Sequence, residues 1–417
     1  MVFHTFDALK SRNFSIYMAG QSVALTGMWV QKLATSWLVY RITESPFLLG
    51  LVELLSNAPI FIVGLLAGAW LEKHDIRKLI IGTQILTLTH AFVMAVLLFT
   101  NTMQMWHILF LSFYLGVVFA IDMPARQASL ILMVNKNSDL KSAIALHSIV
   151  FNLSRLIGPT IAGFIIHLTG EAWCFTITAV SYIPVIIALC IIKFKPRENN
   201  VSKKQSIVQD IIEVVKYSKN VYYMRAMFAF FIVVGFFSYS YSVMLPIYAK
   251  DVLHGNSQVL GFLQGFYGMG AMIGAFVVAT FITMRMLSKT IFILVLLHSV
   301  SMIIFALSTN YYFSLVMMIP AGFGLVSSLI ATNIYLQSAA RSDMRGRVAS
   351  LYSIGTYGLG PLGAFLAGIM TEHFAPQITV IVWCSIMILS AIVFGFKLKR
   401  VNKELEPVWQ EFEKKLS

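Results

Sequence analysis

Five ionisable side chains lie inside long apolar segments of this sequence: Lys32, Glu53, Asp122, Arg126 and Arg155. Placing one of them in the interior of a bilayer costs about 2.5–3.5 kcal/mol, so each is expected to face a partner or a water-filled cavity. Carboxylates in such places take up and release protons, while amines and guanidinium groups hold oxyanions. All five lie in the first half of the chain, so the two halves are expected to differ in chemistry.

Lys32 and Glu53 are predicted to pair across two neighbouring helices. From the centres of their segments and the rise of a helix, both lie about 9 Å from the bilayer midplane, on the same side. One reading makes Glu53 a proton carrier, whose protonation releases Lys32 and whose deprotonation recaptures it. The other makes the two residues a permanent ion pair that only fastens the helices together. The spacing is compatible with both readings.

Asp122 and Arg126 lie in the stretch FAIDMPARQASL, which interrupts an apolar run at residues 119–130. A loop at this point would leave the preceding residues too short to cross a bilayer, so the stretch is placed inside one helix. Pro124 removes a backbone donor between the two charges. Asp122 is either an element of a gate or a proton carrier, and Glu53 is the better candidate for proton coupling.

Arg155 lies near the centre of its apolar segment, just before Gly158-Pro159, and no acid is evident at its depth. Its planar guanidinium suits a carboxylate, catecholate or phosphate group on a bound molecule. Alternatively, it binds backbone carbonyls near the Gly-Pro pair, or Asp122. The second half offers uncharged polar and aromatic side chains instead. The candidate binding residues are Lys32, Arg155, Tyr239, Tyr241, Gln264, Tyr267 and Asn333.

Membrane-spanning helices must position these side chains. The chain has 417 residues, of which 58% are hydrophobic and 12% charged, and its mean hydropathy is +0.79. A soluble domain is about half apolar and a quarter charged, so the composition excludes the soluble classes. At about 20 residues per crossing, hydropathy predicts an all-α membrane protein of twelve helices in two six-helix bundles. The expected bounds are 14–39, 47–71, 78–100, 106–133, 140–168, 172–194, 224–248, 258–283, 289–308, 312–338, 347–371 and 377–398.

The formal net charge of +13 follows membrane topology and does not indicate nucleic acid. Every second connection between the predicted helices is rich in lysine and arginine, whereas the basic residues of the others are only Arg41 and Lys250. By the positive-inside rule, both termini lie in the cytoplasm. Cys174, Cys190 and Cys384 lie singly in apolar runs, so neither a disulfide, a metal site nor a cofactor is expected.

The chain divides into two similar parts. Residues 1–194 form the first bundle and residues 224–400 the second, joined by a cytoplasmic linker, 195–223, whose apolar residues recur at helical spacing. Residues 401–417 are interpreted as a solvated cytoplasmic tail. SDLKSAIALHSIVFNLSRLIGPTIAGF resembles SDMRGRVASLYSIGTYGLGPLGAF in the second half, and LGLVELL resembles LGFLQGF. Parallel repeats of this kind are typical of transporters, with the substrate site at the repeat interface.

The motifs resemble the major facilitator superfamily along essentially the whole chain. The loop GAWLEKHDIRK is similar to the superfamily's loop after its second helix, with departures at Glu72, Lys73 and Ile76. WLVYRITESPFLLGLV, DMPARQA, FNLSRLIGP and MRGRV resemble the branch that holds enterobactin-type siderophore exporters and macrolide-type efflux pumps. This resemblance implies a multi-pass protein of the bacterial inner membrane that exports by proton antiport. Met28 stands where that branch often has an acid.

Two charged clusters at matching positions of the halves are expected to form a cytoplasmic gate. The resemblance implies that they latch the two halves together and that the charges of the fourth helix connect to the basic loop through Arg77 or Lys78. The alternative is that both clusters are ordinary solvated loops. The candidate gate residues are Gly68, Glu72, Asp75, Arg77, Lys78, Arg126, Asp343, Arg345 and Arg347.

The sequence therefore predicts a secondary transporter, monomeric, that exports an amphipathic small molecule by proton antiport and alternating access. The substrate is expected to be a siderophore or a drug-like compound. No glycine-rich loop ending in Lys-Ser or Lys-Thr occurs, so a gradient must supply the energy. A proton-coupled importer of a siderophore or another organic anion is an alternative, and a non-transporting membrane sensor is a remote one. No catalytic cluster of an enzyme is evident.

Overall fold

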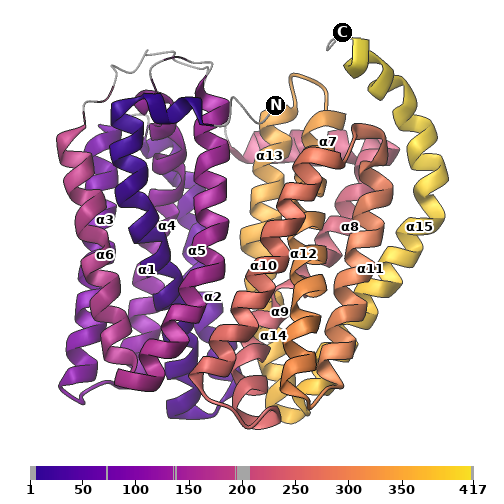
Figure 1. Cartoon of the computed structure of the whole chain (residues 1–417). Coiled ribbons are helices and arrows are strands. Elements are labelled where there is room, and N and C mark those ends of the chain that lie inside the picture. The colour runs from indigo at the N-terminus through magenta and orange to yellow at the C-terminus, as the bar shows by residue number, and fades with distance from the viewer. Residues whose placement is uncertain are drawn as a thin grey trace. The chain divides into compact units, whose positions relative to one another are not determined.

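The computed structural model describes residues 6–71, 74–134, 136, 139–192, 194 and 207–414. All regular structure in this part of the chain is helical (Figure 1). The first half contains η2 (Asp7–Lys10), α1 (Arg12–Thr43), α2 (Pro46–Leu71), α3 (Ile76–Phe99), α4 (Met105–Met133), α5 (Leu140–Thr169) and α6 (Glu171–Ile191). The second contains α7 (Ile207–Asn220), α8 (Tyr222–Ser238), α9 (Ser240–Ile247), η4 (Tyr248–Val252), α10 (Ser257–Phe281), η5 (Met284–Met286), α11 (Leu287–Ala306), α12 (Tyr311–Ala339), α13 (Arg345–Ile354), η6 (Gly355–Leu359), α14 (Gly360–His373) and α15 (Pro376–Lys414).

Helices occupy all twelve of the ranges that hydropathy predicts. Ten helical stretches among the described residues are long and apolar enough to cross a membrane. α1 is not one of them, because polar residues such as Gln21, Gln31 and Lys32 lower its hydropathy. The described part of α2 adds a shorter apolar stretch, Pro46–Ile60. An all-helical, multi-pass membrane protein is thus confirmed, and the count of twelve crossings stays a prediction.

The chain forms two compact units that differ from the predicted halves. Unit 1 comprises Met1–Val201 and Ala249–Gly265, and unit 2 comprises Ser202–Tyr248 and Phe266–Ser417. The first turns of α10 belong to unit 1 because they pack closely on α5. Ser257 donates a hydrogen bond to the carbonyl of Gly163 at 3.0 Å. A Cβ added at Gly163 would lie 2.7 Å from the carbonyl oxygen of Ser257, so glycine is what permits this approach.

Small residues also hold α1 against α6 within unit 1. A Cβ at Gly20 would lie 2.8 Å from the Cα of Val185, and a Cβ at Gly27 only 2.0 Å from Ser181 Oγ. Thr178 uses the same close approach to donate a hydrogen bond to the carbonyl of Gly27 at 2.9 Å. Small side chains allow helix backbones to approach in membranes, where helix association depends on packing.

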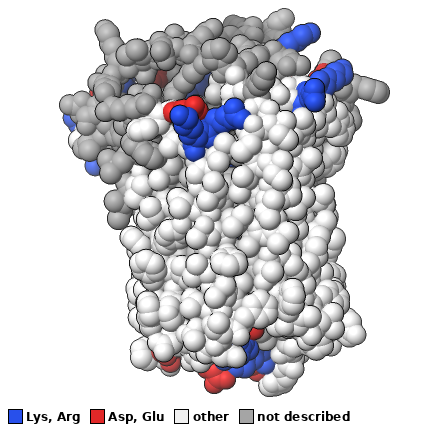
Figure 2. Space-filling model, turned by 90° about the vertical axis from the view of Figure 1, so that its left-hand side faces the viewer, with Lys and Arg blue, Asp and Glu red and all other residues white. Residues whose placement is uncertain are grey.

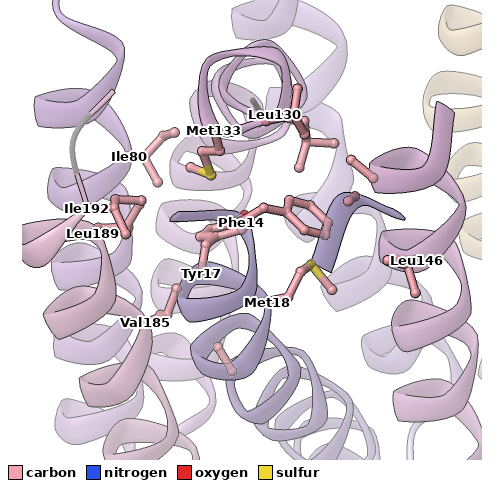
Figure 3. Packing of buried hydrophobic residues seen from close by; sticks show 14 of the residues in the cluster. Phe14, Tyr17, Met18, Ile80, Leu130, Met133, Leu146, Val185, Leu189 and Ile192 are labelled. Carbon is pink, nitrogen blue, oxygen red and sulfur yellow. The ribbon is translucent and has the colours of Figure 1, made fainter. Parts of the chain in front are cut away.

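An apolar cluster lies inside one end of unit 1. We call this end the proximal end because α1 begins there. Figure 3 shows Phe14, Tyr17 and Met18 of α1 among side chains from α3, α4, α5 and α6. Ser11 adds a hydrogen bond to the carbonyl of Met133 at 2.7 Å. The start of α1 is therefore fastened to four other helices. The opposite end of unit 1 is called its distal end.

Unit 2 is built around close contacts of α10, α11 and α12. A Cβ at Gly322 of α12 would lie 2.0 Å from the carbonyl oxygen of Tyr267, and one at Gly324 would lie 2.6 Å from that of Leu294. The predicted seventh crossing is divided into α8 and α9 at Tyr239. The predicted eleventh crossing is divided by the π-helical turn η6, directly before Gly360-Pro361. Proline lacks the donor that would continue the helical pattern, which accounts for the irregular turn.

The predicted solvated tail is wrong for one face of α15. This helix continues without a break from Pro376 to Lys414. Val401, Leu405 and Trp409, which recur at every fourth position, are buried. Trp409 meets the ring of Tyr335 edge-on, with 6.3 Å between centroids. The end of the chain thus covers part of unit 2.

Apolar surface forms a broad band on the outside. On the face shown in Figure 2, charged side chains gather at two opposite ends and the surface between them is uncharged. Large apolar side chains such as Phe92, Phe110 and Val180 are exposed along the helices of unit 1. Exposed apolar surface of this extent marks contact with lipid or with a partner, and helices of this length match a bilayer.

Candidate functional site

The predicted pair of Lys32 and Glu53 is present in unit 1. Lys32 Nζ lies 3.6 Å from Glu53 Oε1, and Asn57, one turn further along α2, donates to the same oxygen at 3.3 Å. The side chain of Lys32 is 46% exposed and that of Glu53 15%. Because 3.6 Å exceeds the length of a direct hydrogen bond, the two groups attract each other mainly through charge. Such a pair can be separated more readily than a buried, hydrogen-bonded one.

Trp29 brings the two predicted cationic binding residues together. Lys32 Nζ lies 5.7 Å from the centroid of its indole ring, and Arg155 Cζ lies 5.4 Å from the same ring. Both distances fall within the range of a cation–π interaction. Sequence reasoning misses Trp29, although its spacing of one helical turn from Lys32 is a signal that could reveal it. Its contact with Arg155 has no signal in the sequence.

α5 holds the indole ring in a fixed position. Phe151 contacts Trp29 edge-on, with 5.7 Å between ring centroids. A Cβ at Gly158 would lie 2.5 Å from Trp29 Cβ, so α5 approaches α1 here because glycine has no side chain. Phe151, Arg155 and Gly158 recur at helical spacing and share one face. Since α5 runs unbroken through Pro159, the Gly-Pro pair acts in close packing.

Asp122 is buried where α3 and α4 meet, and only 1% of its surface is exposed. Its Oδ1 accepts hydrogen bonds from Thr83 Oγ1 and Gln84 Nε2, both at 2.7 Å. Its Oδ2 accepts a hydrogen bond from the guanidinium of Arg126. Both carboxylate oxygens are therefore engaged by donors. This arrangement resembles a fastening between two helices more than a site that exchanges protons freely.

The structure directs Arg77 away from the charges of α4. Arg77 donates from Nε to the carbonyl of Leu189 at 2.9 Å, and from Nη2 to the carbonyl of Cys190, at the end of α6. Basic side chains commonly bind the unpaired carbonyls at a helix C-terminus. Asp75 caps the start of α3 by accepting a hydrogen bond from the amide of Arg77 at 2.8 Å, and Lys78 is exposed. The expected link from this loop to Asp122 is not formed through Arg77.

Two of the predicted gate residues lie wholly or partly outside the described part of the chain. Glu72 lies outside the described residues, and Gly68 lies in a part of α2 of which only the backbone is described. The latch between the two halves therefore stays a prediction.

The second gate cluster makes its contacts inside unit 2. Arg347 Nη1 lies 2.5 Å from Glu213 Oε2 and so connects α13 to α7. Asp343 pairs with Arg341 at 2.8 Å, on the connection between α12 and α13. Arg345 makes a long contact of 3.4 Å with a backbone carbonyl. Sequence reasoning does not single out Glu213, whose place on the amphipathic linker helix was its only signal.

Four candidate binding residues of the second half make three separate contacts in unit 2. Tyr241 and Tyr267 stack, with 4.3 Å between ring centroids and an interplanar angle of 17°. Asn333 Oδ1 accepts a hydrogen bond from Gln337 at 2.6 Å. Tyr239 packs against Gly360, where a Cβ would lie 2.5 Å from its ring. Gln264 is half-buried in the part of α10 that belongs to unit 1.

A polar network that sequence reasoning misses lies at the distal end of unit 1. Lys250 Nζ lies 2.6 Å from Glu44 Oε1, and the hydroxyl of Tyr40 donates to the carboxylate of Asp251. The hydrogen bond from Lys250 and its charge hold the pKa of Glu44 below its ordinary value. These contacts join the end of α1 to the segment before α10. They connect residues that are far apart in the sequence.

The described residues contain no group of three or more histidines, cysteines or acids that could hold a metal ion. Two buried histidines have hydrogen-bond partners of their own. His90 Nδ1 lies 3.2 Å from Gln31 Nε2, and His298 Nδ1 lies 2.9 Å from the carbonyl oxygen of Ala321. Both histidines are therefore interpreted as interior residues held by these hydrogen bonds.

Apolar helices long enough to cross a bilayer, with ionisable side chains paired inside them, define a multi-pass membrane protein. The chain belongs to the transmembrane secretion effector family of the major facilitator superfamily, whose model matches residues 4–416. The members of this family that it resembles are transporters, which confirms the expectation that it is not an enzyme.

Two relatives align with almost the whole chain. The staphyloferrin A transporter of Staphylococcus aureus is 24% identical over 403 residues, which cover 94% of this chain and 96% of the relative. The multidrug efflux pump Tap of Mycolicibacterium fortuitum is 23% identical over 395 residues, which cover 91% and 95%. Among solved structures, the POT family transporter PepTSo has a TM-score of 0.72 at 11% identity, covering 94% of this chain and 98% of that one. That likeness bears on the fold alone.

Proposed function

We propose that the protein is a proton-driven exporter of the bacterial inner membrane that moves an amphipathic small molecule by antiport and alternating access. In this proposal α1 and α2 complete twelve crossings, both termini lie in the cytoplasm, and the protein works as a monomer. Relatives named for transport of staphyloferrin A and for multidrug efflux support a small organic molecule as the substrate.

The observation that carries the proposal is the Lys32–Glu53 pair, 3.6 Å apart and partly exposed. When Glu53 takes up a proton, its carboxylate becomes neutral and no longer attracts the ammonium of Lys32. The ammonium is then available to a substrate, and loss of the proton from Glu53 restores the pair. Proton binding and substrate binding are thereby linked. Glu53 in this way provides the carboxylate that the resembling branch often has at the position of Met28.

Other residues have supporting roles in this proposal. Asp122 and Arg126 act as a gate element, in which Asp122 keeps α3 and α4 in register through Thr83 and Gln84. Asp122 is also a second candidate for proton exchange. The stacked rings of Tyr241 and Tyr267 take the apolar part of the substrate, with Tyr239, Gln264 and Asn333 as further polar contacts. The gate consists of the two charged clusters defined above, including Asp343 and Arg347.

The test uses the purified full chain in proteoliposomes, with staphyloferrin A and the cationic dye ethidium as probes. Flux of at least one probe is expected to accelerate when a pH gradient is imposed and to move protons in the opposite direction. Flux that moves protons and substrate in the same direction would establish the importer instead. No flux of either probe under any gradient would overturn the transport proposal for these compounds and antiport with it.

The variant Glu53→Gln distinguishes a role of Glu53 in proton coupling from a role that only fastens two helices together. This variant is expected to abolish gradient-driven flux while counterflow without a gradient persists, because the amide keeps the shape of the side chain but cannot exchange a proton. Glu171→Gln is the matched control, since Glu171 also pairs with a cation, Arg41 Nε, at 2.5 Å. The control is expected to retain gradient-driven flux. Normal coupling in Glu53→Gln would make the Lys32–Glu53 pair a fastening only.

A further inference from the structure

We propose that Trp29, Lys32 and Arg155 form a subsite for a carboxylate group, and hence that the transported molecule is an organic carboxylate. This inference rests on the proposed transport function and adds the chemical class of the substrate. It is carried by two cationic side chains that lie over one indole ring and by the N–H group of that ring, on α1 and α5.

The first argument concerns charge. Lys32 Nζ and Arg155 Cζ lie 5.7 and 5.4 Å from the same ring centroid, so two cations share a small region. Glu53 balances one of these charges, through its pair with Lys32. When Glu53 takes up a proton, the ammonium of Lys32 loses the carboxylate that attracts it, and an anionic ligand can take the place of that carboxylate.

The second argument concerns the indole nitrogen of Trp29. Its N–H group is buried, and no side chain or backbone atom among the described residues accepts a hydrogen bond from it. A buried donor without an acceptor is unfavourable, so such groups commonly await a ligand or an ordered water. A carboxylate oxygen is a strong acceptor for an N–H donor. The ring thus offers a directional donor beside two positive charges.

The third argument concerns rigidity. Phe151 contacts the indole edge-on, and a Cβ at Gly158 would lie 2.5 Å from Trp29 Cβ. Both contacts come from the face of α5 that also carries Arg155. The indole ring of the subsite is therefore held in place before a ligand arrives, which lowers the entropy lost on binding.

A purely structural role is the competing explanation, because a cation over an indole ring also stabilises helix contacts. The two explanations differ in what they require of the indole N–H group. A structural cation–π contact needs only the aromatic face, which phenylalanine also supplies. A carboxylate subsite needs the N–H donor and discriminates between charged and neutral ligands of one shape.

The experiment measures equilibrium binding of radiolabelled 1-naphthoate to the purified full chain in lipid nanodiscs. Its neutral isostere, 1-naphthamide, is the second probe. Naphthoate is expected to bind at least about tenfold more tightly than naphthamide, as for other hydrogen bonds to a charged partner. Arg155→Gln and Lys32→Gln are expected to remove this preference. Equal binding of the two probes, or no binding of naphthoate, would overturn the proposal.

Trp29→Phe tests the donor while it keeps an aromatic ring. The affinity for naphthoate is expected to fall about tenfold, because a hydrogen bond to the carboxylate is lost. Trp173→Phe is the matched control in the same unit. Trp173 is exposed, and its ring meets the ring of Phe99 edge-on, away from Lys32 and Arg155 in the sequence. Its affinity is expected to stay unchanged. An unchanged affinity in Trp29→Phe would assign the ring to helix packing.

The failure of this proposal can be told apart from the failure of the transport function. Gradient-driven flux of ethidium without a preference for naphthoate would leave the exporter in place and remove the carboxylate subsite. A naphthoate preference that depends on Trp29, without any proton-coupled flux, would leave the subsite in place and remove the antiport mechanism.

Discussion

The interiors of the two units use different interactions. Among the described residues of unit 1, ion pairs lie inside the apolar helices, namely Lys32 with Glu53 and Asp122 with Arg126. In the described part of unit 2, the ion pairs lie on connections, near the start of α13 or along the charged later part of α15, as in the pairs of Arg347 with Glu213 and of Arg400 with Glu404. Charge inside apolar helices is costly, so its concentration in unit 1 is the reason that the proposed coupling and binding residues are assigned to this unit.

The interior of unit 2 consists of aromatic stacking and close backbone contacts instead. Phe230 stacks on Phe394 with 4.7 Å between centroids, and Tyr241 stacks on Tyr267 at 4.3 Å. Gly322 brings α12 against the backbone of α10. Such contacts are rigid and do not depend on protonation. We infer that the two units differ in their response to pH, and substitutions in each unit test this difference.

Asp122→Ala is expected to have the largest effect on stability. Removal of the carboxylate leaves the guanidinium of Arg126 buried without its partner, which costs about 3–5 kcal/mol. Thermal unfolding of the purified chain in detergent measures the loss. Asp343→Ala, which removes an exposed pair with Arg341 in unit 2, is the control and is expected to cost about 0–1 kcal/mol. Equal costs would contradict the contrast between the units.

Trp409→Ala is expected to weaken unit 2 through packing alone. Trp409 is 3% exposed and its ring meets Tyr335, so its truncation is expected to cost about 3 kcal/mol of local stability. Hydrogen exchange along the last turns of α15 measures the change. Trp106→Ala, at a position that is 59% exposed, is the control in unit 1. Unaltered exchange would show that the end of α15 is held by other contacts.

The stack of Tyr241 on Tyr267 is expected to contribute about 0.5–1.5 kcal/mol beyond the area that the rings bury. A double-mutant cycle with Tyr241→Leu and Tyr267→Leu isolates this coupling energy in thermal unfolding. We expect the same coupling at neutral and at mildly acidic pH, because the stack depends on contact between the two rings and not on an ion pair. A coupling energy that changes with pH would remove the distinction between the two units.

Glu44→Gln is expected to have the smallest effect on thermal stability, and this effect is expected to depend on pH. Its pKa lies below the ordinary value of 4.5 because Lys250 donates a hydrogen bond to it and attracts its charge. A lowered pKa in the folded state means that the pair stabilises the protein above the ordinary pKa and that this stabilisation is lost as the pH falls through the lowered one. The difference in thermal midpoint between the natural chain and Glu44→Gln should therefore vanish in acid. A difference that grows in acid would contradict this assignment.

Most of the fold is predictable because hydropathy and helix length are local properties. The expected bounds of α3 to α6 agree with the structure to within a few residues, and the depth of Lys32 and Glu53 follows from the rise of a helix. Their pairing was predictable for that reason. The buried face of α15 was not recognised, although Val401, Leu405 and Trp409 follow a helical spacing, because the charged residues between them hide the apolar stripe.

The candidate site was less predictable where it depends on the rotation of helices. The partner of Arg77 is a pair of carbonyls on α6, and no sequence pattern connects residues that far apart. The contact of Trp29 with Arg155 depends on Gly158, which lets α5 approach α1. Segment 249–265 joins unit 1 because of contacts with α5 and α1, not because of its position in the chain.

Hydropathy and helix geometry predict the class of protein, the places of the helices along the chain and the depth of each charge within them. These properties follow from hydrophobic length and from the constant rise per residue. The folded arrangement sets which charges meet, engages both oxygens of Asp122 and brings Lys32 and Arg155 to one indole ring. These contacts are not predictable from the sequence because packing between side chains from distant segments, chiefly at glycines, sets the rotation of each helix and its neighbours. Such packing leaves no periodic trace in the sequence.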